Sequence, residues 1–373
     1  MGIKQASVLL ILLICLTGCK GQSMSAIQKK LESPKEGRTA VTFSLYAPEA
    51  EKVTLESTFN YWSQEGEIVL YKEDGTHSVT LYLGDEQWLY RFRVDGTWQH
   101  DPTNPLKAEA EGGNFNSVLR RDNLIPESVF NPAIPHGQVL HEVYRSELTA
   151  LAKDYIVYLP PDYTEEKLYP LLFLLHGYGQ PPREFTESAQ IQNYLDNLIH
   201  QKRIEPMVVI MPSGGTSRWS GLSGRHVTEE LYPHIINTYS VYGTRDKTAI
   251  AGGSMGGHGA LKLAYENQDL FGLSAPIMMA GPCQNVLCSY NDFERAYPEP
   301  FELELLLYVG SKDNLGFVDN YHAFSKYLED TEQNYELHIS KHGGHEQDSH
   351  GVRYYRTVLA EILEKVSRFF HNQ

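Results

Sequence analysis

The stretch from Lys247 to Ala264, KTAIAGGSMGGHGALKLA, constrains the fold of this chain more than any other. It begins with a short apolar run, passes through glycines on both sides of Ser254, and continues into an alanine- and leucine-rich segment with helical spacing. Strand, sharp turn and helix in this order predict a nucleophile elbow, whose glycines permit a cramped backbone that raises the serine hydroxyl above a sheet. The alternatives are a glycine-rich turn with an incidental serine and a phosphate-binding loop.

From residue 138 to 373 the sequence alternates apolar runs with amphipathic segments. The apolar runs are DYIVYLP, PLLFLLHG, PMVVIMPSG, KTAIAGG, LELLLYVGS and YELHISK, and the amphipathic segments lie near 188–201, 226–240, 258–267, 318–330 and 352–370. Continuous apolar strands with helical crossovers predict an α/β fold, in which helices cover both faces of a mainly parallel sheet.

Such a sheet carries its functional loops at the carboxyl ends of its strands, where three residues form a candidate triad. Ser254 is the predicted nucleophile. His345 is the predicted base, because it follows a glycine pair that lets a short loop reach over the elbow. Asp313 follows the run LELLLYV and is the predicted acid that orients the base. The chain order serine, aspartate, histidine is that of α/β-hydrolases.

Residues of the same types compete for two of these roles. His342 and His350 lie near the predicted base, but neither directly follows the glycine pair. The acid has three rivals, none of which stands at a predicted strand end: Asp292, Asp319 and Glu299.

An ester hydrolase also needs donors for the oxyanion, and backbone amides are expected to supply them. The predicted donors are the amides of Met255, directly after the nucleophile, and of Tyr178 in the HGYG loop. His176 begins that loop and fits a structural or oxyanion-loop role better than that of a base. His176, Trp219 and His258 are candidates for the substrate pocket, and Trp219, Tyr178 and Met255 are candidate walls for a flat aromatic acyl group. The alternative for His258 is packing within the elbow helix.

Five motifs of this second domain resemble those of the esterase D type of α/β-hydrolase. They are YLPPDY at 158–163, LHGYG at 175–179, EELYPHI at 229–235, AGGSMGG at 251–257 and GGH at 343–345. That group includes carbohydrate esterase family 1, with its feruloyl and acetylxylan esterases, as well as ferric enterobactin esterases, S-formylglutathione hydrolases and mycolyltransferases. The resemblance implies a Ser-His-Asp triad and no cofactor. Departures at 274–280 and 346–348 lie near the acyl pocket and leave the acyl group open.

Residues 35–121 contain short alternating runs separated by turn signals, which predict a small β-sandwich. The segments FNYW at 59–62, YRFRVDGTW at 90–98 and HDP at 100–102, together with GNFN at 113–116, resemble family 48 carbohydrate-binding modules, which are immunoglobulin-like domains. The resemblance implies that this module binds glycan through four residues: Trp62, Arg91, Trp98 and Asn116. The alternative is that both tryptophans pack and that the module only braces the second domain.

The N-terminal sequence predicts that the protein is exported from the cytoplasm. Lys4 precedes an apolar run over 8–16 that is too short to span a bilayer, and the run ends in Leu-Thr-Gly-Cys19. This ending resembles the lipobox of bacterial lipoproteins, so residues 1–19 are expected to be a signal peptide that leaves Cys19 lipidated. The lysine that follows Cys19 is consistent with export to the outer membrane, whose face the sequence leaves open. An ordinary signal peptide with a chance cysteine is the alternative. Residues 20–34 are expected to be a tether, and 122–137, rich in proline and glycine, a linker.

Charge and cysteine content exclude other classes of protein. A net charge of -15 argues against nucleic acid and anionic membrane surfaces as partners, so membrane contact is expected only through the N-terminal lipid. Cys283 and Cys288 could close a small disulfide loop in an oxidising compartment, or remain two free thiols. The absence of zinc-type cysteine and histidine spacing predicts no structural metal.

Together these features predict an exported, lipid-anchored serine esterase that removes feruloyl or acetyl groups from a plant polysaccharide such as arabinoxylan. Two alternatives stay open. One is a trilactone siderophore esterase of the enterobactin type, although the acidic chain shows no arginine cluster at the predicted loops. The other is a surface glycan-binding protein whose hydrolase domain is inactive.

Overall fold

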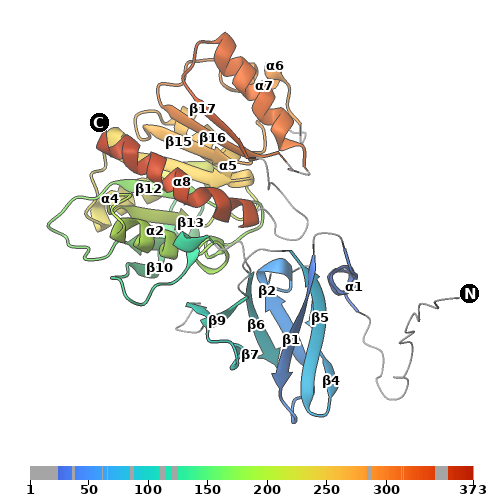
Figure 1. Ribbon diagram of the computed structural model, residues 1–373. Coiled ribbons are helices and arrows are strands. Elements are labelled where there is room, and N and C mark those ends of the chain that lie inside the picture. The colour runs from blue at the N-terminus through green and yellow to red at the C-terminus, as the bar shows by residue number, and fades with distance from the viewer. Residues whose placement is uncertain are drawn as a thin grey trace, which may run out of the picture.

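The computed structural model describes residues 24–372 except 36–37, 61, 65, 85–87, 110–114, 120–124, 284–286, 312, 314 and 341–351. Buried apolar side chains form two separate clusters, one within residues 27–92 and one within 155–370. The chain therefore folds into an N-terminal β-domain and a C-terminal α/β-domain, drawn in blue to teal and in green to red in Figure 1.

The N-terminal domain is a sandwich of two antiparallel sheets, as predicted. One sheet has the strand order β1-β5-β4 and the other the order β3-β2-β6-β9-β8, with β7 paired to β6. Alternate residues such as Val79 and Leu81 point into the shared core. The strands are β1 (Thr39–Tyr46), β2 (Val53–Ser57), β3 (Ile68–Val69), β4 (Tyr71–Glu73), β5 (Thr76–Leu83), β6 (Trp88–Val94), β7 (Thr97–Gln99), β8 (Lys107–Glu109) and β9 (Phe115–Leu119), with a 3-10 turn η1 (Thr58–Asn60).

The expectation of a featureless tether over 20–34 is wrong for its second half. Helix α1 (Ala26–Glu32) lies there, and Ile27 and Leu31 are buried in the core of the N-terminal domain. The buried side chain of Gln28 accepts a hydrogen bond from the Val69 amide and donates one to the Val69 carbonyl, at 3.0 Å each. Two apolar residues spaced for one helix face therefore fix the segment to the module.

The C-terminal domain is built on an eight-stranded sheet of order β10-β11-β13-β12-β14-β15-β16-β17. From β13 to β17 neighbouring strands are parallel, while β10 and β11 form an antiparallel hairpin at one edge. The prediction of a mainly parallel sheet is confirmed. The sheet also contains β10, a strand that no apolar run in the sequence predicted. The strands are β10 (Gln138–Ser146), β11 (Leu151–Leu159), β12 (Leu171–Leu175), β13 (Val208–Pro212), β14 (Thr248–Gly253), β15 (Leu273–Ile277), β16 (Glu304–Gly310) and β17 (Glu336–Ser340).

Helices cover this sheet. Helix α5 packs on β12, β14 and β15, and α8 contacts α2 as well as β14, β15 and β16. Figure 1 shows α8 lying across the sheet. The helices are α2 (Ile191–His200), α3 (Leu222–Arg225), α4 (Tyr232–Thr238), α5 (Met255–Glu266), α6 (Tyr290–Ala296), α7 (Phe317–Asp330) and α8 (Val352–His371), with π-helical segments η4 (Glu184–Ser188) and η5 (His226–Leu231) and a 3-10 turn η6 (Arg245–Lys247). No helix among the described residues is long and apolar enough to cross a membrane.

The predicted linker is anchored to the C-terminal domain where it is described. It contains a 3-10 turn, η3 (Pro126–Ser128), whose carbonyls accept hydrogen bonds from two side chains of α2. Asn193 donates to the Ser128 carbonyl at 2.9 Å, and Asn197 donates to the Glu127 carbonyl at 3.0 Å. The linker is therefore a fixed connection along this part of its length.

Candidate active site

Ser254 occupies a strained turn between β14 and α5. Its φ of 56° and ψ of -114° lie in a region that residues with side chains rarely adopt, and such conformations persist only where the surroundings enforce them. The Ser254 amide donates to the Ile277 carbonyl at 2.8 Å, and the Ser254 carbonyl accepts from the Ala280 amide at 3.2 Å. Strand β15 and the loop after it thus hold the elbow, and the serine stands half-exposed at the carboxyl edge of the sheet.

Two glycines of the elbow are required by close backbone contacts. A Cβ at Gly256 would lie 1.9 Å from the carbonyl oxygen of Leu175, and one at Gly252 would lie 2.4 Å from the carbonyl oxygen of Gly256. These neighbours are main-chain atoms, so no side chain can move to make room. The contact also places the end of β12 against the first turn of α5, which brings the loop after Leu175 to the elbow.

The loop from His176 to Gln180 leaves one backbone amide without a partner among the described residues. The amide of Gly177 donates to Gln180 Oε1 at 2.7 Å, and the amide of Gly179 donates to the Gly215 carbonyl at 3.1 Å. The amide of Tyr178 has no acceptor in the described part of the chain, and neither has that of Met255 at the start of α5. Unpaired amides at a helix N-terminus and in an adjacent loop can donate hydrogen bonds to a developing oxyanion.

His176 fixes this loop and does not face a substrate. It is fully buried, and burial lowers its pKa to about 4, so the ring is neutral. Its Nε2 accepts from the Gly214 amide at 2.8 Å, which leaves the proton on Nδ1, and Nδ1 donates to the Gly177 carbonyl at 2.7 Å. His176 therefore has a structural role in the loop, and its assignment to the substrate pocket is wrong.

The predicted acid lies where the sequence placed it. Asp313 follows β16 and is half-buried, and its Oδ1 accepts from the amides of Leu315 at 3.0 Å and Phe317 at 3.2 Å. These bonds fix the carboxylate at the carboxyl edge of the sheet. Strand β17 ends beside β16, with Ser340 opposite Gly310. His345 comes five residues later and lies outside the described residues.

Two other predicted pocket residues are buried behind the elbow. Trp219 has no exposed surface and packs so closely on two backbone segments that a Cβ at Gly214 or Gly259 would lie 2.6 Å from its ring. Its Nε1–H donates to the His176 carbonyl at 3.1 Å. His258 is 6% exposed, and burial lowers its pKa to about 4. Both residues support the elbow. Met255, at 3% exposure, is buried as well. Tyr178 is 68% exposed, so its side chain can form a wall of the substrate pocket.

Sequence reasoning missed Arg218, which lies beside the elbow. Its Nη2 donates to the carbonyls of Gly281 at 3.0 Å and Cys283 at 3.3 Å, and its amide contacts the Met255 sulfur at 3.3 Å. A disulfide joins Cys283 to Cys288, so Arg218 braces a closed loop after β15 against the elbow. The sequence offered one signal, the cysteine pair, and none for the arginine.

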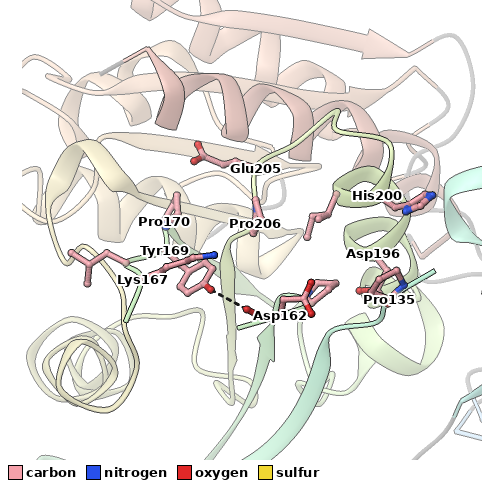
Figure 2. A pocket seen from close by; sticks show the side chains of 12 residues that line it. Pro135, Asp162, Lys167, Tyr169, Pro170, Asp196, His200, Glu205 and Pro206 are labelled. Atoms are coloured by element: carbon pink, nitrogen blue, oxygen red, sulfur yellow. Dashed lines mark hydrogen bonds between the residues drawn. The ribbon is translucent and has the colours of Figure 1, made fainter. Parts of the chain in front are cut away.

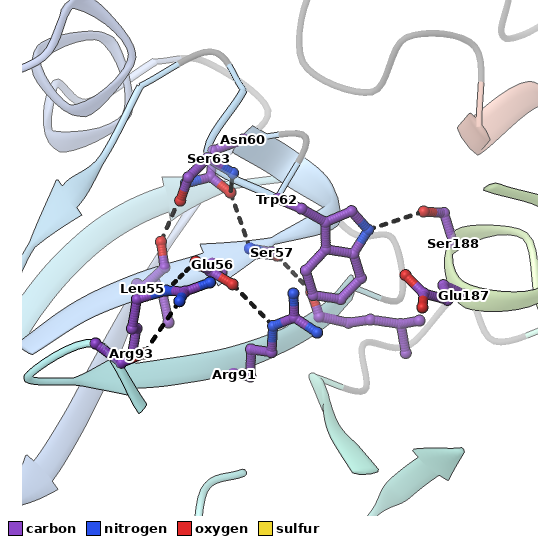
Figure 3. Close-up of polar contacts among 12 residues, drawn as sticks. Leu55, Glu56, Ser57, Asn60, Trp62, Ser63, Arg91, Arg93, Glu187 and Ser188 are labelled. Carbon is purple, nitrogen blue, oxygen red and sulfur yellow. Dashed lines mark hydrogen bonds and ion pairs between the residues drawn. The ribbon is translucent and has the colours of Figure 1, made fainter. Parts of the chain in front are cut away.

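Three of the four predicted glycan-binding residues contact one another, and one of the three also contacts the C-terminal domain. Figure 3 shows Trp62 reaching η4, where its Nε1–H donates to Ser188 Oγ at 3.1 Å. The guanidinium of Arg91 lies 4.7 Å from the Trp62 ring and 3.3 Å from the Trp98 ring, and its Nε donates to Glu56 Oε2 at 2.8 Å. Trp62 thus belongs to the contact between domains.

These residues do not form an open platform. Arg91 is 6% exposed and Asn116 has no exposed surface, while Trp98 is 39% exposed. Nη1 of Arg91 and both polar atoms of the Asn116 side chain are buried without a partner among the described residues. The expectation of four residues ready to meet a sugar is therefore corrected. Trp98 has exposed surface, but the guanidinium of Arg91 already packs against its ring.

One cavity of the described structure lies away from the elbow. It measures about 400 Å³ and sits at the amino ends of β12 and β13, beside Tyr169, Pro170 and Pro206 (Figure 2). Ser254 lies at the opposite edge of the same sheet, because β12 and β14 are parallel. The buried carboxylate beside the cavity, Asp196, already accepts hydrogen bonds from His136, Gly137 and Tyr158. This cavity is not part of the candidate active site.

Comparison with protein families matches both domains. Residues 152–366, more than half of the chain, match a family described as "Putative esterase", and residues 40–123 match the "Glycogen recognition site of AMP-activated protein kinase". A curated relative, the endo-1,4-beta-xylanase/feruloyl esterase of Xylanibacter ruminicola, is 29% identical over 247 residues, which is 62% of this chain. The chain spans about a third of that relative's length, 34%.

Solved structures share the fold. A ferulic acid esterase aligns with 63% of this chain and 99% of its own, at a TM-score of 0.56 and 21% identity. The enterobactin esterase of Shigella flexneri, solved in the presence of enterobactin, aligns with 91% of this chain and 95% of its own, at a TM-score of 0.59 and 15% identity. At these identities the likeness establishes the α/β-hydrolase architecture, and in the second case it extends over the N-terminal domain.

Proposed function

This chain belongs to the esterase family that residues 152–366 match, and we propose that it is a serine carboxylesterase that removes feruloyl or acetyl groups from a plant polysaccharide such as arabinoxylan. The observation that carries the chemistry is the elbow: strained Ser254 is followed directly by the amide of Met255, and the loop after Leu175, which holds the amide of Tyr178, packs against the first turn of α5. Neither amide has an acceptor among the described residues. A nucleophile next to two such donors is the arrangement that acyl transfer needs.

In the proposed reaction the Ser254 hydroxyl attacks the ester carbonyl and passes its proton to His345. The new bond from Oγ to the carbonyl carbon gives a tetrahedral intermediate, whose negative oxygen is bound by the amides of Tyr178 and Met255. His345 then returns the proton to the departing sugar oxygen, which leaves an acyl-enzyme. Water, activated by the same histidine, releases the carboxylic acid and restores the serine. Asp313, fixed by two backbone amides, holds the histidine in the required tautomer.

The polysaccharide substrate is proposed from the relatives and from the N-terminal domain. The Xylanibacter ruminicola relative carries both xylanase and feruloyl esterase in its description, and residues 40–123 match a glycogen recognition site. A weak glycan site joined to an esterase raises the effective concentration of ester groups at the elbow. The bond from Trp62 to Ser188 supports the alternative, in which the module braces the second domain.

Two tryptophan variants separate glycan binding from bracing. If the module binds glycan, Trp98→Ala should weaken retention of the protein in an arabinoxylan affinity gel, because Trp98 is 39% exposed and its aromatic face can pack against a sugar ring. If the module is only a brace, retention of Trp98→Ala should equal that of the wild type. Trp62→Ala would then lower thermal stability through the lost contact with Ser188, without any change in retention.

We further propose that the protein is an exported lipoprotein of the outer membrane, anchored through Cys19. The proposal rests on the Leu-Thr-Gly-Cys sequence that follows the apolar run of the N-terminus. Labelling with a radioactive fatty acid in a bacterial host tests it. Wild-type protein should take up label and sediment with membranes, and Cys19→Ala should do neither. Equal labelling of both proteins would exclude Cys19 as the site of lipidation.

Substrate release tests the proposed function. Residues 20–373, with Ser254→Ala as control, would be incubated separately with feruloylated arabinoxylan and acetylated xylan, and the products separated by chromatography. Ferulate or acetate released by the wild type alone supports the proposal and names the acyl group. Release of neither, with an activated aryl acetate still cleaved, would discard the polysaccharide as substrate.

A trilactone siderophore is the second candidate substrate. The observation that favours it is the enterobactin esterase structure, which aligns with both domains of this chain. Arg218 also supplies one cation beside the elbow of an otherwise acidic protein. Hydrolysis of enterobactin by the wild type, together with inert polysaccharides, would support this candidate. A protein inert toward every ester would instead fit a glycan-binding protein with an inactive hydrolase domain.

A further inference from the structure

We propose that Gln180 is a positioning residue of the oxyanion hole, and that its side-chain amide holds the loop from His176 to Gln180 in the conformation that presents the Tyr178 amide. The inference rests on the proposed esterase activity. It does not depend on which acyl group or polysaccharide the enzyme uses. Gln180 belongs to none of the predicted motifs that carry the triad or the donors.

Gln180 closes the loop on both sides of Gly177. Its side-chain Oε1 accepts from the Gly177 amide at 2.7 Å, and its own amide donates to the Gly177 carbonyl at 3.3 Å. The side chain is 7% exposed, so the first bond is shielded from water. A Cβ at position 177 would lie 2.6 Å from Oε1, which means that the glutamine fits only because a glycine faces it.

The direction of the Tyr178 N–H follows from these bonds. In a trans peptide the carbonyl and the N–H point in opposite directions. The Gly177 carbonyl belongs to the same peptide group as the Tyr178 N–H, and it is turned inward by bonds from His176 Nδ1 and from the Gln180 amide. The Tyr178 N–H is therefore turned outward, and it is the one amide of residues 177–180 without an acceptor in the described structure.

Glycine at position 177 makes this restraint necessary. A residue without Cβ reaches many backbone conformations, so the peptide between Gly177 and Tyr178 can rotate unless both of its neighbours are held. After Tyr178, the chain is fixed by the hydrogen bond that the Gly179 amide donates to the Gly215 carbonyl, at 3.1 Å. Before Tyr178, it is fixed by the hydrogen bond that the Gly177 amide donates to Gln180 Oε1. Removing that acceptor leaves a buried donor unpaired, and rotation of the loop is the way to pair it again.

The expected effect is kinetic. Loss of a complete oxyanion donor lowers kcat by about 10²- to 10³-fold, and a donor that is present but misdirected part of the time should lower kcat by about 10-fold or more. Because the amide acts mainly on charge that develops in the transition state, KM should change by no more than about twofold.

Three variants separate positioning from general stability. Gln180→Met keeps the length of the side chain and removes the acceptor, while Gln180→Glu keeps an acceptor oxygen. Gln333→Met is the matched control, since Gln333 Oε1 accepts a backbone amide from Phe301 at 2.9 Å near the amino end of β17, at the edge of the sheet away from the elbow. If Gln180→Met does not fold, Gln180→Asn serves in its place, because its shorter side chain does not reach Gly177.

The experiment measures kcat and KM on 4-nitrophenyl acetate, thermal stability, and affinity for a trifluoromethyl ketone that forms a charged hemiketal with Ser254. In Gln180→Met, kcat should fall by about 10-fold or more and the affinity for the ketone should fall in parallel. In Gln180→Glu, both kcat and ketone affinity should return toward the wild-type values. The control should lose stability alone. Full kcat in Gln180→Met, or no recovery in Gln180→Glu, would overturn the inference while the wild type remains an active esterase. A wild type inert toward the ester would instead remove the proposed function, and this inference with it.

Discussion

The buried carboxyl of Glu184 should make the protein less stable as pH rises, and Glu184→Gln should remove that dependence. Glu184 begins η4, shortly after the loop that ends at Gln180. It is 3% exposed and has an Oε1 atom without a partner among the described residues. Burial raises its pKa from 4.5 to about 8, and the nearby charge of Glu187 adds to the shift. The folded protein therefore holds this proton at neutral pH.

The sign and size of the effect follow from proton linkage. As pH rises from about 4.5 to about 8, the unfolded chain releases the proton of Glu184 while the folded chain keeps it, so the free energy of unfolding falls. At about 1.4 kcal/mol for each unit of pKa, the loss reaches at most about 5 kcal/mol near pH 8 and stays constant above it. A glutamine at this position carries no proton to lose.

Urea denaturation followed by tryptophan fluorescence measures this difference. The wild type, Glu184→Gln and the control Glu166→Gln, which changes an exposed loop residue, would be compared at pH 5, 6.5 and 8. Glu184→Gln should be close to the wild type at pH 5 and more stable by several kcal/mol at pH 8. The control should follow the wild type throughout. A gap between Glu184→Gln and the wild type that stays the same from pH 5 to pH 8 would show that Glu184 does not cause the loss of stability.

Three further predictions concern the elbow and the loop beside it. Gly256→Ala should yield no folded, labelled enzyme, because its Cβ would meet the Leu175 carbonyl at 1.9 Å, and soluble yield with fluorophosphonate labelling checks this. Replacing Cys283 and Cys288 together by serine should lower the free energy of unfolding by about 2 kcal/mol, measured by urea denaturation, and an unchanged value would contradict the contribution of the disulfide loop. The wild type should lose about 3 kcal/mol more stability than His258→Gln between pH 6.5 and 4, because burial lowers the pKa of His258 to about 4 and the folded state resists its protonation; parallel curves would contradict this.

The sequence was sufficient where local constraints decide the structure. The apolar run before Ser254 predicted β14, and the glycines around the serine predicted the turn, since close backbone contacts at Gly252 and Gly256 exclude every other residue. The amides of Tyr178 and Met255, which the motifs predict as oxyanion donors, have no acceptor among the described residues. Each of these features depends on residues close together in the chain.

Other features depend on contacts between distant residues, and the sequence did not reveal them. Trp219 was expected to face a substrate, but it is enclosed by Gly214 and Gly259, and no local pattern distinguishes an enclosed tryptophan from an exposed one. The contact between Trp62 and Ser188 joins residues 126 positions apart in different domains. Burial of a polar or aromatic residue in such a contact is a property of tertiary packing, so its surroundings have to be seen.

Labelling of the purified protein with a fluorophosphonate, followed by mass spectrometry of its peptides, shows directly whether Ser254 is a reactive nucleophile. We expect a single adduct on the peptide that carries Ser254, with labelling abolished in Ser254→Ala. No adduct on the folded wild-type protein, or an adduct that persists in Ser254→Ala, would contradict the assignment of this elbow as the nucleophile of an esterase.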